Sequence, residues 1–238
     1  MNLEILKNLE LIKSPNSETR EGAYSRLVEL FSVKKNAPTL EDKNQYLSML
    51  CNKDFLFNEI DAGPSDHSVA RSFSLLVMGI IIEGDKTNEL DAEKIISPIL
   101  KYIEQESDFR GKDEQLGWIH SLAHLGDLLA FLSFHKGISK KSIELISLAM
   151  IEKLASLNDL TLNHGEDKRL ASGLFYAFEE SLGSNTVILN SLRSGFNLNY
   201  PSKQNIDNLL RCLYIELITN GKDKNLADQV KLILMSHD

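Results

Sequence analysis

A long stretch with almost no charge constrains the fold of this chain more than any other feature. From Gln115 to His135 the sequence contains no Lys, Arg or Glu, and Asp127 is its only carboxylate. Asp113, just before this stretch, has a side chain suited to a helix N-cap, so we predict one helix from Asp113 to about Phe134. A helix with so little charge around its circumference is normally buried on most sides. The sequence therefore predicts a fold in which other helices surround this segment.

Three polar residues of the predicted helix fall on one side of it. At about 100° per residue, His120, His124 and Asp127 form a stripe roughly 60° wide. Trp118 and a series of leucines form an apolar face, and small residues around Gly126 allow another helix to approach closely. Burying an unpaired carboxylate is costly, so Asp127 is expected to pair with the imidazoles or with an arginine from a neighbouring helix.

Charged residues from other segments are expected beside this stripe. Glu106, Asp108 and Arg110 precede the predicted helix, and Gly111 permits a tight turn that brings them back toward His120.

Two further arginines are candidates for the same groove. Arg71 is the only base in an apolar helix predicted for about residues 66–83, so it must reach solvent or a carboxylate, with Asp108 or Asp127 as the expected partner. Arg169 follows two carboxylates that suit a helix N-terminus, Glu166 and Asp167. The candidate ligand-binding residues are Arg71, Glu106, Asp108, Arg110, Trp118, His120, His124, Asp127, Asp167 and Arg169.

Three interpretations of this cluster remain open. It forms a buried hydrogen-bonded network, a ligand pocket without a cofactor, or a divalent metal site in which His120, His124 and Asp127 are the ligands. The zinc-protease motif H-E-x-x-H is not matched, because Ser121 follows His120 and the general base is missing.

Charge and composition exclude several classes of protein. The net charge of −8 argues against nucleic acid as a partner, because phosphate binding needs clustered Lys and Arg. The longest apolar run, residues 75–82, is too short to span a membrane. Two distant cysteines and an N-terminus unlike a signal peptide predict a cytoplasmic protein.

The hydrophobic pattern is helical nearly throughout. We predict an all-α fold of about eleven helices without strands, in one domain that spans residues 1–238. Thr39 and Ser139 are suited to cap two of these helices. Short connections place successive helices antiparallel, and stacked helical hairpins give an αα-superhelix. No internal sequence period is evident.

Several spaced motifs resemble those of the family called domain of unknown function 2785. They are E-x-D-x-R-G from Glu106 to Gly111, G-W-x-H-x-x-A-H-x-x-D from Gly117 to Asp127, an R-S-F segment at Arg71, and G-E-D-x-R-L-A from Gly165 to Ala171. The resemblance implies a bacterial, HEAT-like helical protein and supplies no activity.

Two functions fit these observations. One is a binding scaffold whose groove of His, Asp and Arg side chains holds a protein segment, a peptide or a small polar ligand. The alternative is a metal-assisted hydrolase with His120, His124 and Asp127 as ligands and Glu106 or Asp108 as the base. The sequence does not indicate an oligomeric state.

Overall fold

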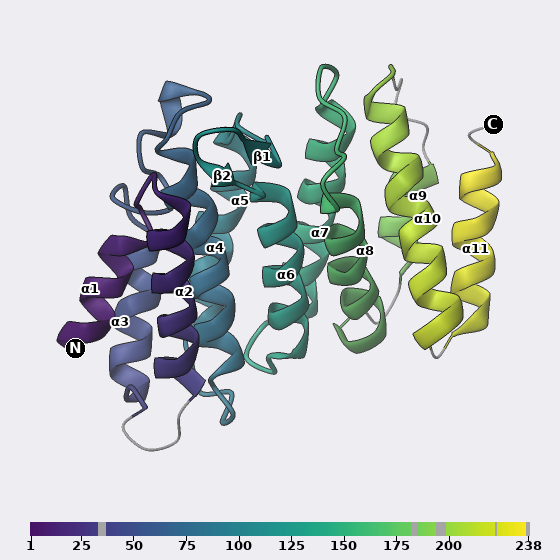
Figure 1. Ribbon diagram of the computed structural model, residues 1–238. Coiled ribbons are helices and arrows are strands. Elements are labelled where there is room, and N and C mark those ends of the chain that lie inside the picture. Colours follow the sequence, from purple (N-terminus) through teal and green to yellow (C-terminus); the bar gives the residue numbers. More distant parts are fainter. Residues whose placement is uncertain (33–36, 182–184, 194–198, 222, 237–238) are drawn as a thin grey trace.

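The protein is built from α-helices that pack beside one another as antiparallel hairpins. A computed structural model describes residues 1–32, 37–181, 185–193, 199–221 and 223–236 (Figure 1). The eleven α-helices of these residues are α1 (Leu3–Leu11), α2 (Ser17–Ser32), α3 (Leu40–Leu50), α4 (Ser68–Glu83), α5 (Ile96–Gln105), α6 (Ser121–Phe134), α7 (Lys140–Ser156), α8 (Glu166–Tyr176), α9 (Thr186–Arg193), α10 (Ser202–Asn220) and α11 (Lys224–Met235). Shorter elements are the 3-10 helices η1 (Ile60–Ala62) and η2 (Ala92–Ile95), the π-helix η3 (Ala177–Ser181), and the strands β1 (Lys112–Asp113) and β2 (Gly117–Trp118). The predicted all-α class is confirmed.

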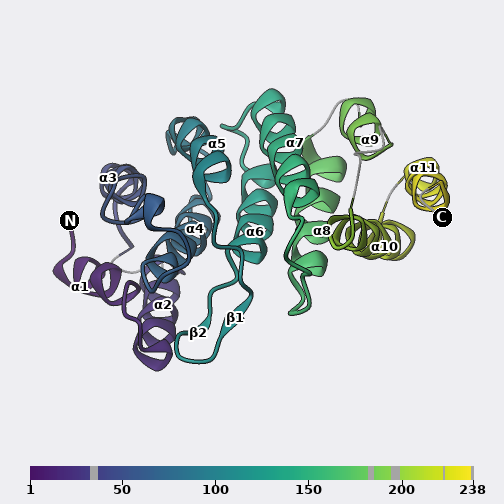
Figure 2. The ribbon, with the colours of Figure 1, turned by 90° about the horizontal axis from the view of Figure 1, so that it is seen from above.

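The helices stand in two curved rows. Seen from above, α2, α4, α6, α8 and α10 form the row on the concave side, and α3, α5, α7 and α9 form the row on the convex side (Figure 2). One continuous cluster of buried apolar side chains extends through both rows, from Ile5 in α1 to Ile233 in α11. Within the described residues, every helix is too short or too polar to cross a lipid bilayer.

Side-chain caps fix where several helices begin. Thr39 accepts a hydrogen bond from the backbone N–H of Asp42 at 3.1 Å and Ser139 accepts one from Ser142 at 3.1 Å, at the starts of α3 and α7. Each cap satisfies a backbone donor that has no partner within its helix. Both predicted caps are therefore confirmed.

The segment before α6 corrects the prediction of one helix from Asp113. Residues 112–118 form a short antiparallel β-hairpin instead, with Lys112 opposite Trp118, and α6 begins only at Ser121. Asp113 accepts the N–H groups of Gln115 and Leu116 and therefore closes the hairpin turn rather than capping a helix. Gly117 (φ 73°) and His120 (φ 55°) adopt left-handed backbone conformations, which a continuous right-handed helix excludes.

The hairpin also places Trp118 differently from the prediction. Its side chain lies on β2 and is 38% exposed, so Trp118 is not part of the apolar face of α6. The leucines predicted for that face, among them Leu122, Leu125 and Leu129, are fully buried.

Helices α6 and α8 approach each other at two glycines. A Cβ atom added to Gly126 would lie 2.5 Å from the backbone oxygen of Arg169, and one added to Gly173 would collide with the backbone oxygen of Gly126. The prediction that Gly126 permits a close helix approach is therefore confirmed. This contact sets the spacing between the side chains that α6 and α8 present to each other.

We expect Gly126→Ala to lower the free energy of unfolding by about 1–3 kcal/mol, because the added methyl group must separate two backbones. Gly22→Ala in α2 is the matched control, since a Cβ atom added there would have no other atom within 4 Å. That control should be neutral or stabilising by up to about 1 kcal/mol, because Ala favours helix more than Gly. Urea unfolding of both variants measures the difference, and equal behaviour would show that the helices can move apart freely.

Candidate functional site

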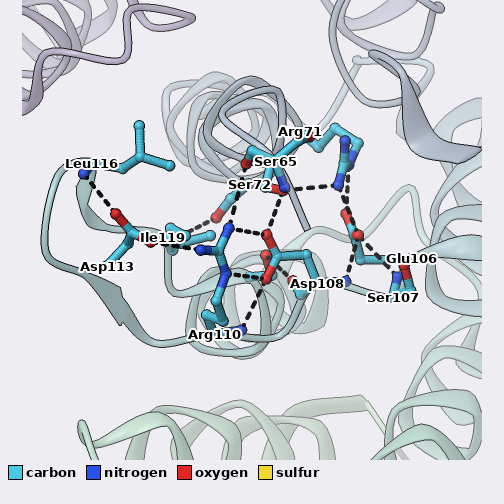
Figure 3. A network of polar contacts seen from close by, with 12 residues as sticks. Ser65, Arg71, Ser72, Glu106, Ser107, Asp108, Arg110, Asp113, Leu116 and Ile119 are labelled. Atoms are coloured by element: carbon cyan, nitrogen blue, oxygen red, sulfur yellow. Dashed lines mark hydrogen bonds and ion pairs between the residues drawn. The ribbon is translucent and has the colours of Figure 1, made fainter. Parts of the chain in front are cut away.

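A fully buried ion pair connects the start of α4 to the end of α5. Arg71 is 0% exposed, and its Nε and Nη2 donate to the two carboxylate oxygens of Glu106 at 2.6 and 2.9 Å (Figure 3). Glu106 Oε1 also accepts the backbone N–H groups of Ser107 and Asp108, so the turn after α5 directs this carboxylate toward α4. Arg71 therefore pairs with a carboxylate, as one of the two predicted alternatives has it, but the carboxylates named for it, Asp108 and Asp127, were wrong.

Asp108 continues this network toward the hairpin. Its carboxylate accepts the Ser68 hydroxyl at 2.5 Å and Arg110 Nη2 at 2.8 Å, and Arg110 Nη1 reaches Asp113 at 2.6 Å (Figure 3). Burial alone would raise the pKa of Asp108, but the hydrogen bonds from Arg110 and Ser68 outweigh it and lower that pKa. The network therefore holds an ionised Asp108 and ties the hairpin to α4.

A second buried arginine fixes the other side of the hairpin. Arg20 of α2 is 0% exposed and donates to the backbone oxygens of Leu116 at 2.6 Å and Trp118 at 3.1 Å. It also donates to the oxygen of Ser14 at 2.8 Å. The hairpin is thus held on one side by Arg20 of α2 and on the other by Arg110, which precedes β1 and is tied to α4 through Asp108 and Ser68.

His120 lies between an aromatic ring and a carboxylate. Its ring stacks on Trp118 with centroids 4.5 Å apart and planes 8° from parallel, and its Nδ1 lies 3.0 Å from Glu166 Oε1. Glu166 is buried at the start of α8. Burial opposes ionisation of Glu166, but the hydrogen bonds from His120 and from the backbone N–H groups of Glu166 and His164 lower its pKa.

His124 is a buried neutral imidazole. Its Nδ1 lies 2.7 Å from the Ser72 hydroxyl and 3.2 Å from the Ser72 backbone oxygen. The Ser72 hydroxyl donates to the backbone oxygen of Ile119, so the proton between the two side chains belongs to His124 Nδ1. Burial lowers the pKa of His124 far below its usual range, and the positive charges of Arg169 and Arg20 lower it further.

Asp127 pairs with an arginine of a neighbouring helix, one of the two kinds of partner expected. Arg169 Nε donates to Asp127 Oδ1 at 3.0 Å, and Arg169 Nη2 donates to the other oxygen. The sequence pattern predicted that Asp127 would be buried. Instead, the side chain of Asp127 is 30% exposed and that of Arg169 is 32% exposed. Asp127 and Arg169 therefore lie at the surface, on the concave side of the molecule.

Asp167 takes no part in these contacts. Its carboxylate accepts the backbone N–H of Lys168 and lies 4.0 Å from the Cys212 sulfur of α10. Glu166, the residue before it, is the one that reaches His120. One position along a helix turns a side chain by about 100°, which is enough to separate these two carboxylates.

The proposed metal ligands are directed to three different partners. His120 contacts Glu166, His124 contacts Ser72, and Asp127 contacts Arg169. In the described part of the chain, no three His, Cys, Asp or Glu side chains are arranged to hold a metal ion. The geometry gives no support to the metal-site interpretation.

Sequence reasoning missed Arg20, Ser68, Ser72 and Glu166 as members of the network. Ser68 lies three residues before Arg71 in the apolar helix, so it is on the same side of α4 as that arginine, and Ser72 lies one turn after Ser68. This spacing of small hydroxyl residues around a lone arginine is a readable signal. Nothing local to Arg20 indicates that its partners lie in a hairpin 96 and 98 positions away.

A cavity of about 650 Å³ opens on the concave side, between α2, α4, α6 and α8. The cavity beside Arg110 has about 210 Å³ by comparison. Asp127 is the candidate site residue that lines the larger one. This cavity is also lined by aromatic and by charged or titratable side chains, which are Tyr24, Phe131, Phe134 and Tyr176 and Glu83, Asp85, Lys86 and His135. We call it the concave cavity.

A buried carboxylate organises one wall of the concave cavity. Asp85 accepts hydrogen bonds from Thr87, from the backbone N–H of Leu90 at 2.9 Å and from His135 Nε2 at 3.1 Å. Burial opposes ionisation of Asp85, but these hydrogen bonds outweigh it and lower its pKa. His135 Nδ1 accepts the N–H of Gly137, so the ring proton is on Nε2 and the imidazole is neutral. The wall therefore carries one negative charge.

We expect Glu106→Gln to lower the free energy of unfolding by about 3–5 kcal/mol, because it leaves the Arg71 charge buried without a counter-ion. Glu29→Gln is the control, since Glu29 pairs with Arg26 on the surface and is 63% exposed. That variant should cost about 1 kcal/mol or less. Chemical unfolding compares the two, and similar losses would contradict a structural role of the buried pair.

The buried state of His124 predicts a pH dependence. In the unfolded chain His124 binds a proton near pH 6.5, whereas in the folded protein it remains neutral to a much lower pH. As the pH falls below about 6.5, proton binding therefore favours the unfolded state. Between about pH 7 and pH 5, the wild-type protein should lose about 2 kcal/mol of unfolding free energy that His124→Gln does not lose. His67→Gln is the control, because His67 is 49% exposed and should leave the wild-type pH profile unchanged. Parallel profiles for the wild type and His124→Gln would show that His124 is solvated.

Comparison with known proteins gives one family. The model of the family described as "Protein of unknown function (DUF2785)" matches residues 56–215, a range that includes every candidate site residue from Arg71 to Arg169. No match is found among curated proteins or among solved structures. Since the match covers more than half of the chain and confirms the resemblance seen in its motifs, this protein belongs to the DUF2785 family.

Proposed function

We propose that the protein is a binding module that holds a ligand in the concave cavity. The observation that carries the proposal is the cavity itself. Its volume of about 650 Å³ lies within the range of small-molecule sites, and aromatic side chains with a few polar groups line it, as is typical of such sites. Phe134 is 53% exposed at the cavity although it is a large apolar residue, and bound ligand would cover it.

The buried polar network supports this function without touching the ligand. Arg71, Glu106, Asp108, His124 and Glu166 are each at most a few per cent exposed, and each has a hydrogen-bonded partner in the chain. Residues in this state cannot contact a ligand without first losing their partners. Their role is to fix the relative positions of α4, α6 and α8, which form the walls of the concave cavity.

Binding is favoured over catalysis. Among the described residues, Ser72 and His124 come closest to a nucleophile and its base. Both side chains are buried, however, and the imidazole donates to the hydroxyl instead of accepting its proton. Asp127 and Arg169 stand at the surface as an ion pair suited to orienting a polar ligand group. Of the predicted site, Asp127 lines the cavity and is assigned to the ligand, and Arg169 holds the Asp127 carboxylate in place.

The same proposal includes a HEAT-like arrangement of the helices and a location in the bacterial cytoplasm. Stacked antiparallel hairpins with a concave binding side are the arrangement of HEAT-like arrays. Cys51 and Cys212 are free and partly buried thiols, as expected in a bacterial cytoplasm that keeps cysteines reduced.

Filling the concave cavity tests the proposal. Ala130→Trp places an indole in the cavity, and a screen of small soluble aromatic compounds by ligand-observed NMR should find binders that this variant no longer binds. Ala149→Trp in α7 is the matched control, because it adds the same side chain at a half-buried alanine of the other row. We expect binding to fall at least about tenfold in Ala130→Trp and to stay unchanged in Ala149→Trp. Equal binding by both variants would place the ligand elsewhere.

A further inference from the structure

We infer that the ligand of the concave cavity is a small organic cation, an alkylated ammonium compound. This inference rests on the proposed binding function and names the chemical class of its ligand. It is drawn from the aromatic rings and the charges that the cavity brings together.

Aromatic rings form the main recognition surface of the concave cavity. Tyr24, Phe131, Phe134 and Tyr176 line it and come from three helices, α2, α6 and α8. The rings of Phe134 and Tyr176 touch, with centroids 4.9 Å apart and planes 54° from parallel. The faces of aromatic rings carry negative potential and attract cations, most strongly where water is partly excluded.

The charges around the cavity are negative in sum. Asp127 is paired with Arg169, so this ion pair adds no net charge. Asp85 is ionised beside a neutral His135, and the positive charge of Lys86 offsets it. That leaves Glu83, which is exposed and for which no hydrogen-bond or ion-pair partner was found among the described residues. Burial raises the pKa of Tyr24, the negative charges of Asp127 and Glu83 raise it further, and the positive charge of Arg169 lowers it, so the Asp127–Arg169 pair and Glu83 all act on this phenol. An anionic ligand would meet repulsion at this wall.

The lining of the cavity favours an alkylated ammonium group over a metal ion or a bare ammonium. The remaining lining consists of the apolar residues Leu76, Ile82 and Ala130 and the uncharged polar residues Asn88 and Ser172. A small, strongly hydrated cation gains little from such a surface, because its hydration is lost without replacement. An alkylated nitrogen spreads its charge over methyl groups that also pack against apolar side chains. Such a ligand is attracted to the aromatic rings through its charge and packs against the apolar side chains through its methyl groups.

The test compares choline with its uncharged carbon isostere, in which a carbon atom replaces the quaternary nitrogen. The two have the same shape, so isothermal titration or ligand-observed NMR isolates the contribution of the charge. We expect choline to bind the full-length protein at least about tenfold more tightly than the isostere. Phe134→Leu keeps apolar bulk at an exposed position, and it should weaken choline binding about three- to tenfold while leaving the isostere unchanged. Glu83→Gln should also weaken only choline.

The outcomes separate this inference from the proposed function. Equal binding of choline and the isostere, with both lost in Ala130→Trp, would overturn the cation and leave the binding module standing. Binding of aromatic compounds without any binding of choline would do the same. A capped lysine serves as a second cationic probe, because its side chain ends in a bare ammonium group. We expect it to bind more weakly than choline, and tighter binding of the capped lysine would overturn the alkylated ammonium.

Discussion

The buried ion pair between Arg71 and Glu106 is the interaction on which the rest of the structure depends. Two charges without solvent are tolerated only when every donor and acceptor has a partner. Here the Ser68 hydroxyl and the backbone oxygens of Asn58 and Glu59 accept from Arg71, and the backbone turn after α5 donates to Glu106. Because these requirements are directional, the pair permits one arrangement of α4 against the end of α5. Apolar packing alone would allow the helices to slide or rotate. Asp108 and Arg110 then carry the same constraint into the hairpin.

The hairpin transmits that constraint to α6. Arg20 and the Asp108 network hold it from two sides, and His120 directly after it adopts a left-handed conformation that starts α6 in a fixed direction. His120 then reaches Glu166 at the start of α8. One connected set of polar contacts therefore runs from α2 through α4 and α6 to α8, along the ends of the helices. The concave cavity lies between these four helices, so its width follows from contacts that do not line it.

Sequence patterns predicted the parts of this structure that depend on local periodicity. The all-α class, the helix starts at Thr39 and Ser139, the burial of α6 and the close approach at Gly126 all follow from spacing within one segment. The hairpin was missed because its cause is remote: Gln115 to Ile119 suit a helix locally, and the backbone oxygens of Leu116 and Trp118 turn outward to meet an arginine from α2. The partner of Arg71 was missed because several carboxylates were available and only the turn geometry after α5 selects Glu106.

The same distinction explains why the predicted site moved. A stripe of polar residues on an apolar helix indicates that partners exist, but not whether those partners are ligands or other side chains. His120 and His124 contact Glu166 and Ser72 and so help to hold the helices together. Asp127, a turn further along α6, reaches the concave surface. The cavity there is lined largely by residues that no motif distinguishes, such as Tyr24 and Phe134, because a cavity is defined by what adjacent helices leave unfilled. Polar motif residues whose side chains all have partners within the protein therefore support a binding site and do not contact the ligand. The ligand is expected to bind where neighbouring aromatic side chains remain exposed.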